Sequence, residues 1–453
     1  MVRSKYILLI LAAVLGFSSC KLGQKYARPE LEIPDFAESD DEAAELLPWK
    51  ELYMDEVLQE LIEVALENNK DMLIAAAKIK EMMAANRISF ANMFPEFDIR
   101  LNAQKEVLNY GGDHREPDPE YSVKSFFAWE VDLWGNLRWA NDASLATYLQ
   151  SVEAQRALRL TLISEVASKY YELCALDREL SIVQQTRSAR QESVRLARLR
   201  FEGGLTSETA YRQAEVELAR TETLIPELEK QISIKESDLS LLLGHYSGEI
   251  PRGVSLSEQE LPDHLPVGLS STLMERRPDI RRAEQKLKEA NARVGVAYTN
   301  LFPRLRLTGN FGLESEELVD LLKSPAWFIN SDLIAPLFMM GKNKARLKVA
   351  KARYEQELYS YEKSVLEAFR EVHNALINVR KTKEVRAART QLEISSRTYA
   401  QLAYLQYING ITSYMDVLDA QRRLLDAQIG LNNAKLDELR SIVSLYKALG
   451  GGY

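Results

Sequence analysis

The chain carries one pattern of residues twice. The segment 199–207 (LRFEGGLTS) reappears at 405–413 (LQYINGITS), and Leu243-Gly244 reappears as Leu449-Gly450. In both matches the equivalent residues stand 206 positions apart. A repeat of this length predicts two copies of one structural unit rather than two unrelated domains. We place the copies at residues 48–244 and 270–453, with a linker at 245–269 between them.

Each copy contains a long stretch that has no proline and no glycine, at residues 136–201 and 342–408. As helices these stretches would each run roughly 100 Å at about 1.5 Å per residue, far beyond the globular average of about a dozen residues. Shorter helices are predicted at 207–243 and 412–449, after turns built on Gly203-Gly204 and Asn409-Gly410.

Helices of this length need partners to pack against. One heptad position of the first long helix is apolar except at Arg187, which predicts helix pairing. Pro226 predicts a kink in the helix that follows. The residues on that heptad position are Val166, Leu173, Leu180, Val194 and Phe201.

The residues before each long helix alternate between apolar and polar side chains. Ile99 and Leu101, for example, alternate with Arg100 and Asn102. An apolar residue at every second position gives a strand one apolar face, so this pattern predicts strands. We place them at about 93–107, 121–133, 303–313 and 326–337.

Each of these strands has at least the roughly 9 to 11 residues that a tilted strand needs to cross a bilayer. Trp129, Trp134 and Trp327 would then form interfacial girdles. The alternative is a pair of ordinary hairpins in a soluble domain, with one face on a core.

The N-terminus has the layout of a secretory signal. Arg3 and Lys5 precede an apolar run over 6–17, and Phe17-Ser18-Ser19-Cys20 ends it. Small residues before a cysteine resemble a bacterial lipobox, which implies removal of residues 1–19, diacylation of Cys20 and a lipid-anchored segment at 20–47. An ordinary signal peptide with an incidental cysteine is the alternative. With Cys20 acylated, Cys174 is the remaining thiol, so no intrachain disulfide is expected.

Past the signal, no apolar stretch approaches the length of about 18 residues that a spanning helix requires, so membrane passage would have to use the strands. Four strands cannot close a barrel, and an open sheet edge in lipid is prohibitively costly. Several copies are therefore expected to pool their strands, and three copies would supply twelve.

Composition narrows the class of protein. A net charge of -8 excludes the strongly basic footprint of a nucleic-acid binder. The histidines are scattered without metal-ligand spacing, and there is no phosphate-binding loop or nucleophile elbow. We therefore expect no catalytic residues, no bound metal, no cofactor and no nucleic-acid partner. The four histidines are His114, His245, His264 and His373.

Several motifs resemble the TolC-like outer-membrane efflux proteins, in particular the lipoprotein branch that serves resistance-nodulation-division pumps. They are the segments 129–135 (WEVDLWG), 276–280 (RRPDI), 300–303 (NLFP) and 416–421 (DVLDAQ). The resemblance covers nearly the whole mature chain. It implies a mainly α fold with a membrane β-barrel, in which a homotrimer forms a 12-stranded barrel in the outer membrane and a 12-helix tunnel across the periplasm.

The resemblance also implies functional residues and partners. In that family the helical turns meet a periplasmic membrane-fusion adaptor, which in turn joins an inner-membrane pump. The matching residues here are Gly203, Gly204, Leu205 and Thr206 in the first copy, and Asn409, Gly410, Ile411 and Thr412 in the second. As an alternative, these residues are only helix caps.

A gate at the periplasmic entrance is implied as well. Asp416 and Asp419 match acidic residues of the family's tunnel entrance, and three copies would make rings that attract cations. Tyr407 matches a tyrosine of the entrance latch, but Ala210 and Thr412 stand where its aspartate and arginine partners would be. Carboxylates on a solvated helix face are the alternative.

The function expected from these observations is that of a passive outer-membrane channel, which exports small molecules such as drugs, toxic compounds or metal ions. The competing hypothesis is a lipid-anchored periplasmic coiled-coil scaffold without a pore.

Overall fold

The computed structural model describes residues 21–31, 47–108, 116–262, 270–336 and 338–451. The chain divides into two compact units. The strand unit combines residues Met1–Leu31, Ala77–Val152 and Arg282–Lys363, and the helical unit combines Glu32–Ala76, Glu153–Arg281 and Ser364–Tyr453. The predicted signal peptide, Cys20 and most of the segment 20–47 lie outside the described residues.

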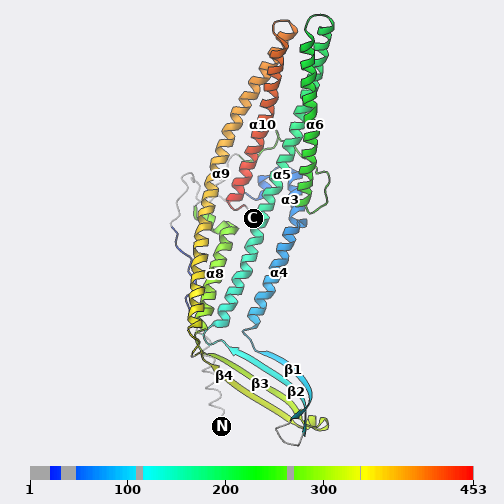
Figure 1. Cartoon of the computed structure of the whole chain (residues 1–453). Coiled ribbons are helices and arrows are strands. Elements are labelled where there is room, and N and C mark those ends of the chain that lie inside the picture. Colours follow the sequence, from blue (N-terminus) through cyan, green and yellow to red (C-terminus); the bar gives the residue numbers. More distant parts are fainter. Residues whose placement is uncertain (1–20, 32–46, 109–115, 263–269, 337, 452–453) are drawn as a thin grey trace. The chain divides into compact units, whose positions relative to one another are not determined.

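The strand unit contains one antiparallel sheet of four strands in the order β1-β2-β3-β4 (Figure 1). β1 and β4 are its edges. A short 3₁₀ helix, η1 (Leu318–Lys323), stands between β3 and β4. The strands are β1 (Glu96–Leu108), β2 (Glu116–Val131), β3 (Arg304–Ser315) and β4 (Pro325–Ile334).

Three strand ends differ from the sequence prediction by three residues or more. β1 begins at Glu96 rather than near 93. β2 begins at Glu116 rather than near 121, because its first residues pair with the far end of β1, where Leu108 stands opposite Glu116. Backbone pairing therefore extends β2 through the segment 116–120, which is rich in proline and acidic residues. β4 ends at Ile334 rather than 337, at its pair with Arg304. Pro336 follows, and a proline has no backbone N–H to donate to a ladder.

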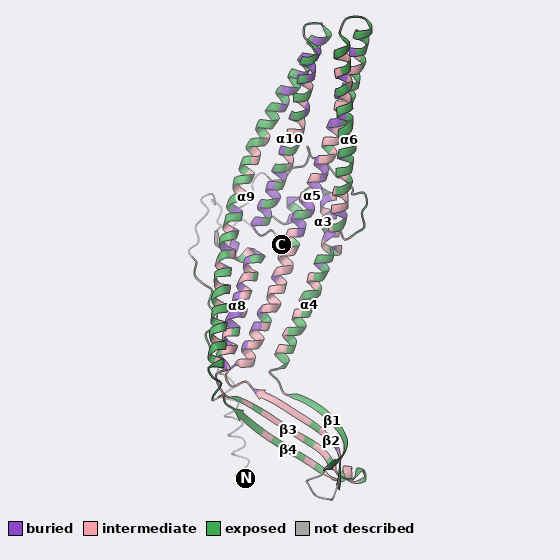
Figure 2. Ribbon diagram, viewed as in Figure 1, coloured by how far each residue is buried: buried purple, intermediate pink, exposed green. Residues whose placement is uncertain are grey.

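The register of the sheet gathers the apolar side chains on one face. Phe97 stands opposite Phe127, Trp129 opposite Leu307, and Phe311 opposite Trp327. On the edge strands the large side chains of this face, such as Leu101 and Ile329, are exposed, and Figure 2 shows β1 largely exposed. The other face is mostly polar, since alternate residues of a strand point to opposite sides, although Phe126 and Phe328 also lie on it. Its residues include Asp98, Arg100, Lys124, Arg306 and Asp332.

Aromatic residues cluster where helices give way to strands. The indole N–H of Trp129 donates to the carbonyl of Met93 at 3.1 Å, and that of Trp134 donates to the carbonyl of Pro303 at 2.7 Å. The rings of Trp134 and Phe302 lie 5.3 Å apart between centroids. Each indole therefore has its polar group satisfied while its ring stays on the surface of the junction, as amphipathic aromatic residues do at interfaces.

The two longest helices of each copy have the same lengths in both copies. α5 (Asn136–Glu202) and α9 (Lys342–Ile408) both have 67 residues, and α6 (Glu208–Leu242) and α10 (Tyr414–Ala448) both have 35. α6 is continuous although it contains Pro226. The remaining helices are α2 (Trp49–Leu52), α3 (Glu56–Asn68), α4 (Lys70–Ala91), α7 (Ser270–Arg276) and α8 (Pro278–Thr299).

The core of the helical unit is built on large aromatic side chains, including Tyr53, Tyr171 and Tyr446, which are almost fully buried. A polar contact lies inside it. The hydroxyl of Tyr170 donates to Oδ2 of Asp55 at 2.7 Å and accepts from the backbone N–H of Gly253 at 2.8 Å. Asp55 also caps α3. The first part of the linker is thereby fixed to the core of the helical unit.

None of the helices in the described ranges has the length and apolar character of a membrane span.

Candidate functional site

The two interhelical turns of the helical unit have the same backbone geometry. Gly204 and Gly410 have φ values of 69° and 76°, the left-handed conformation that ends a helix at low cost in glycine. The N–H of Leu205 donates to the carbonyl of Arg200 at 2.8 Å, and the N–H of Ile411 donates to that of Gln406 at 2.9 Å. These bonds define Schellman motifs, as the glycine pattern predicts.

Each turn presents one apolar side chain to the surroundings. Leu205 is 79% exposed and Ile411 is 72% exposed. Apart from the neighbouring residues of the chain, no described atom lies within 4 Å of the position that a Cβ would take on Gly204 or on Gly410. Each turn therefore has an open surface made of backbone and one aliphatic side chain.

The cap residues at the start of the next helices differ between the copies. Ser207 is the N-cap of α6 but makes no side-chain capping bond. Ser413 is the N-cap of α10 and forms a capping box with Asp416, whose Oδ2 accepts from the Ser413 N–H at 3.0 Å and from its hydroxyl at 2.8 Å. Asp416 therefore has a structural role that the sequence interpretation did not assign.

The other predicted gate residues also have local partners. Asp419 pairs with Arg423 at 2.7 Å, one helical turn along α10, and both side chains are exposed. Asp416 and Asp419 are exposed on one face of α10. Tyr407 belongs instead to a buried apolar cluster with Tyr414, Val417 and others, and its hydroxyl has no hydrogen-bond partner in the described part of the chain.

Arg200 joins the ends of the two long helices. Its Nη1 donates to the carbonyl of Tyr407 at 2.9 Å and its Nη2 to that of Ile408 at 3.0 Å. Its guanidinium carbon lies 4.5 Å from the centroid of the Tyr407 ring. A cation at the last carbonyls of a helix satisfies acceptors that have no intrahelical donor and favours the helix dipole. Sequence reasoning missed this contact, although an arginine near a helix end is a recognised capping signal.

A buried ionic cluster connects α5, α6 and α10. Oε2 of Glu217 lies 3.2 Å from Nη1 of Arg190, and both side chains are 5% exposed. Nη1 of Arg190 also donates to the carbonyl of Glu217 at 2.8 Å and to the hydroxyl of Thr221 at 2.5 Å. Arg422, which is about half exposed, pairs with Oε1 of Glu217. Glu217 thus lies between two guanidinium groups from two other helices.

The electrostatics of this cluster follow from its contacts. The hydrogen bond from Arg422, assisted by the charge of Arg190, holds the pKa of the Glu217 carboxyl below its ordinary value although burial opposes this. Burial lowers the pKa of the Arg190 guanidinium, and Glu217 opposes that shift. No sequence pattern indicated this cluster, because Glu and Arg pairs are frequent on solvated helix faces.

The segment that follows Cys20 is fixed to the strand unit. Lys21 pairs with Asp142, and its ammonium lies 3.7 Å from the centroid of the Trp139 ring. The N–H of Leu22 donates to the carbonyl of Trp134 at 3.0 Å, and the Trp139 indole donates to the carbonyl of Leu22 at 2.7 Å. Lys21 and Leu22 therefore lie against the start of α5, close to where β2 ends.

Among the described residues, no group of three or more His, Cys, Asp or Glu side chains could hold a metal ion.

Comparisons with known proteins decide the family. The model of the outer membrane efflux protein family matches residues 61–245 and 269–451. This chain belongs to that family. It is an outer-membrane efflux channel, and the family consists of transport channels rather than enzymes. The predicted family, outer-membrane location and efflux role are confirmed.

Individual relatives cover most of the channel's length. The solvent efflux pump outer membrane protein SrpC of Pseudomonas putida is 34% identical over 411 residues, which are 89% of this chain and 87% of the relative. The cation efflux system protein CusC of Escherichia coli O157:H7 is 30% identical over 459 residues, 98% of each chain. Among solved structures, the outer-membrane channel OprN superposes with a TM-score of 0.90 at 28% identity, covering 96% of this chain and 99% of OprN.

The predicted fold class is confirmed by the described residues, which are mainly helical with four antiparallel strands, and by this likeness to solved channels.

Proposed function

We propose that three copies of this efflux channel assemble by pairing β1 of one copy with β4 of the next, so that twelve strands close a barrel in the outer membrane and the helices form a periplasmic tunnel. The observation that supports this most is the sheet, whose apolar face is exposed and whose two edges are free to pair within the described chain. In lipid, unpaired strand edges are too costly to persist. A soluble hairpin would instead cover its apolar face with a core.

Cross-linking and bilayer recordings test this assembly. The purified channel in non-ionic detergent should cross-link to trimers and no further, and should give discrete conductance steps in a planar bilayer. A monomer without conductance would favour the alternative, a lipid-anchored periplasmic scaffold without a pore. Membrane fractionation separates the two after the lipid is cut, because a scaffold leaves the membrane and a barrel stays.

The proposal includes a lipid on Cys20. Lys21 and Leu22 hold the chain at the junction of β2 and α5, beside the aromatic residues Trp134 and Trp139. A diacylated Cys20 would then enter the same bilayer leaflet that the aromatic junction meets. Mass spectrometry of the mature N-terminus tests this, and Cys20→Ala is the matched variant. Since Cys174 is buried, it provides no competing site for acylation.

The turns are proposed to contact a periplasmic membrane-fusion adaptor, through the residues 203–206 and 409–412. Replacing Gly204 and Gly410 with bulky residues should abolish efflux but leave trimers intact, and unchanged resistance would reject the contact. These substitutions also strain a left-handed backbone. The pair Leu205→Asp and Ile411→Asp is a sharper test because it keeps the turn glycines.

Val216→Asp is the matched control for the turn variants, since Val216 is an apolar residue that is 65% exposed on α6 away from the turn. Loss of efflux with both turn substitutions, but not with the control, is the expected result. Equal loss with the control would indicate general damage to the surface instead of a contact at the turns.

For the entrance we propose that Asp416 and Asp419 of three copies form acidic rings, and that Tyr407 is part of the gate. Asp419→Asn is the cleaner variant because Asp416 also caps α10. It should reduce cation over anion permeability in a salt gradient, whereas the exposed Glu227→Gln on α6 should not. An unchanged reversal potential would leave Asp419 as a solvated helix residue.

The adaptor would link this channel to an inner-membrane pump of the resistance-nodulation-division class, with the channel itself passive. The names of the relatives differ in what those proteins export, a solvent in one case and cations in another. Copurification of the full-length channel with an adaptor and a pump after cross-linking in cells tests the tripartite arrangement.

A further inference from the structure

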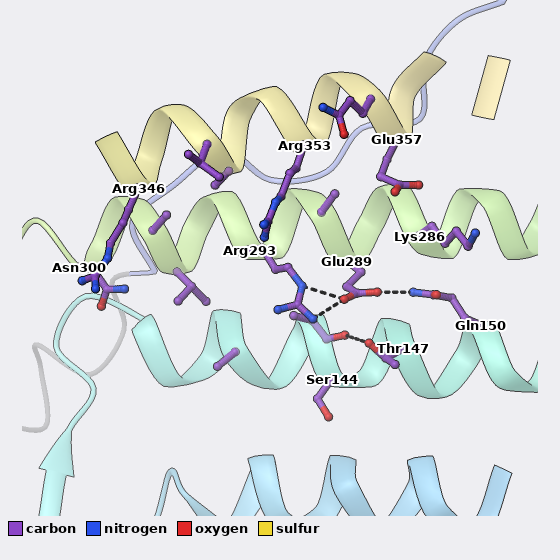
Figure 3. A pocket seen from close by; sticks show the side chains of 18 of the residues that line it. Ser144, Thr147, Gln150, Lys286, Glu289, Arg293, Asn300, Arg346, Arg353 and Glu357 are labelled. Carbon is purple, nitrogen blue, oxygen red and sulfur yellow. Dashed lines mark hydrogen bonds and ion pairs between the residues drawn. The ribbon is translucent and has the colours of Figure 1, made fainter. Parts of the chain in front are cut away.

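A cavity of about 1270 Å³ lies among α4, α5, α8 and α9 within the strand unit (Figure 3). Its wall contains several small aliphatic side chains, among them Ala143, Ala290, Val296 and Val349. The hydroxyl residues Ser144 and Thr147 also line it. The cavity is therefore wide and combines apolar surface with a few polar groups, as small-molecule sites do.

The charged residues of this cavity are mostly cations. Five cationic side chains line it against two carboxylates, so its formal net charge is +3. The cations are Lys286, Arg293, Lys342, Arg346 and Arg353, and the carboxylates are Glu289 and Glu357. This is opposite in sign to the net charge of -8 of the whole chain.

One of the two carboxylates is already neutralised within the wall. Oε1 of Glu289 accepts from Nε of Arg293 at 2.7 Å, and its Oε2 accepts from the amide of Gln150 at 2.6 Å (Figure 3). The guanidinium of Arg346 has only a long contact of 3.4 Å to the neutral amide oxygen of Asn343, and Arg353 forms no ion pair within the described part of the chain. On α9 three lining cations stand against one lining carboxylate, Glu357, so a net positive charge is left for an outside partner.

The start of α9 carries basic residues on two opposite faces. Lys342, Arg346 and Arg353 line the cavity. Lys344, Lys348 and Lys351 are exposed but do not line it, because at about 100° per residue they lie on the far side of the helix. The helix thus provides its own control, with three cations that line the cavity and three that do not.

We propose that this cavity binds amphipathic organic anions as they pass through the channel, with the aliphatic wall holding the apolar part and Arg346 and Arg353 holding the acidic group. Planar guanidinium groups suit carboxylate and sulfonate oxygens, which they bind through two parallel hydrogen bonds. The inference rests on the proposed channel, since it requires the cavity to face the lumen. It names the chemical class of compound that the lumen favours.

Cysteine labelling tests whether the cavity is open in the assembled protein. Arg353→Cys in membrane vesicles should react with a water-soluble, negatively charged methanethiosulfonate reagent, while the buried Cys174 gives little background. No reaction of Arg353→Cys, with reaction of an exposed control such as Lys348→Cys, would mean that a second copy covers the cavity. That outcome would overturn the proposal.

Channel block measures the binding itself. Decanoate should block single-channel current in the wild-type protein at lower concentration than decyltrimethylammonium, which has the same tail and the opposite charge. In Arg346→Gln/Arg353→Gln, the decanoate concentration for half block should rise at least about tenfold, as expected for the loss of charged hydrogen bonds. In the matched variant Lys344→Gln/Lys348→Gln, the decanoate concentration for half block should equal that of the wild type.

The outcomes separate this inference from the channel proposal. If the protein gives no conductance, the proposed trimeric pore fails, and the binding site fails with it. If the protein conducts but decanoate and decyltrimethylammonium block it at equal concentrations, the pore stands and the anion site is wrong. The same conclusion follows if both double variants raise the decanoate concentration for half block by the same factor.

Discussion

Glu217→Gln is the substitution whose effect on the helical unit follows most directly from the structure. Glu217 is the shared counter-ion of Arg190 and Arg422, and the substitution would keep the shape of the side chain while removing its charge. Arg190 would then be buried without a carboxylate. Removing one partner of a buried ion pair costs about 3 to 5 kcal/mol. We expect the lower end, about 3 kcal/mol, because a glutamine can still accept hydrogen bonds and Arg422 remains half in solvent.

The effect should be seen as local opening of α5, α6 and α10. Each 1.4 kcal/mol is a factor of about ten in an equilibrium constant, so the open population of this region should rise about 100-fold. Hydrogen exchange of the trimer in non-ionic detergent measures this for amides in residues 210–221, whose exchange follows local opening.

Two further variants make the Glu217 reasoning falsifiable. Glu215→Gln lies two residues away on the same helix, but Glu215 pairs with Arg212 at the surface, so exchange should match the wild type. Arg190→Met/Glu217→Leu removes both buried charges and should recover most of the lost protection. The account of the buried cluster would be refuted if Glu217→Gln exchanged at the wild-type rate, or if Glu215→Gln accelerated exchange as much as Glu217→Gln does.

Three other predictions concern separate parts of the molecule. Because the pKa of Glu217 is lowered in the folded state, its charge stabilises the fold above the ordinary carboxyl pKa, and this stabilisation is lost as pH falls through the lowered value. Hydrogen exchange of α6, corrected for the intrinsic rate at each pH, should therefore accelerate below about pH 4 in the wild type but not in Glu217→Gln. Asp416→Ala removes the capping box with Ser413 and should destabilise the first turn of α10 by about 1 kcal/mol, measured by exchange of its amides. Leu101→Arg places a cation on the apolar face of β1 and should cost about 2 to 4 kcal/mol at mid-bilayer, lowering the yield of trimer on gels, whereas Asn102→Arg on the polar face should assemble normally.

Local patterns were sufficient to predict the elements of the fold. The prediction of residues 136–201 and 342–408 as helices differs from α5 and α9 by a single residue at Glu202. Proline-free, glycine-free stretches leave few alternatives to helix, and glycines at 204 and 410 end them in the expected left-handed conformation. The four strands were found because a sheet with one apolar face imposes period two on the sequence.

Packing was harder to predict along the length of a helix. The heptad assignment places Val166 and Phe201 on one face of α5, yet Val166 is fully buried and Phe201 is 37% exposed. A straight helix drifts by about 20° per heptad, which adds up to about 100° over the five heptads between these residues. Ala197 and Ser193 are buried in this part of α5 instead.

The least predictable features were the contacts of charged residues. Whether Glu217 is a solvated or a buried carboxylate depends on where Arg190 and Arg422 come to lie, and these residues stand on two other helices. The same holds for Arg200, whose acceptors are carbonyls at the end of α9. Only the tertiary arrangement brings these residues together, since no short sequence motif relates them.

The identical lengths of α5 and α9 limit how this protein can change in evolution. A single residue inserted into the middle of α5 would turn every later side chain by about 100° and advance it by about 1.5 Å along the helix axis. Arg190 would then leave Glu217, and Arg200 would leave the carbonyls at the end of α9. Insertions and deletions in one long helix are therefore expected to persist only with a matching change in the other copy, so that the two halves of the gene change length together.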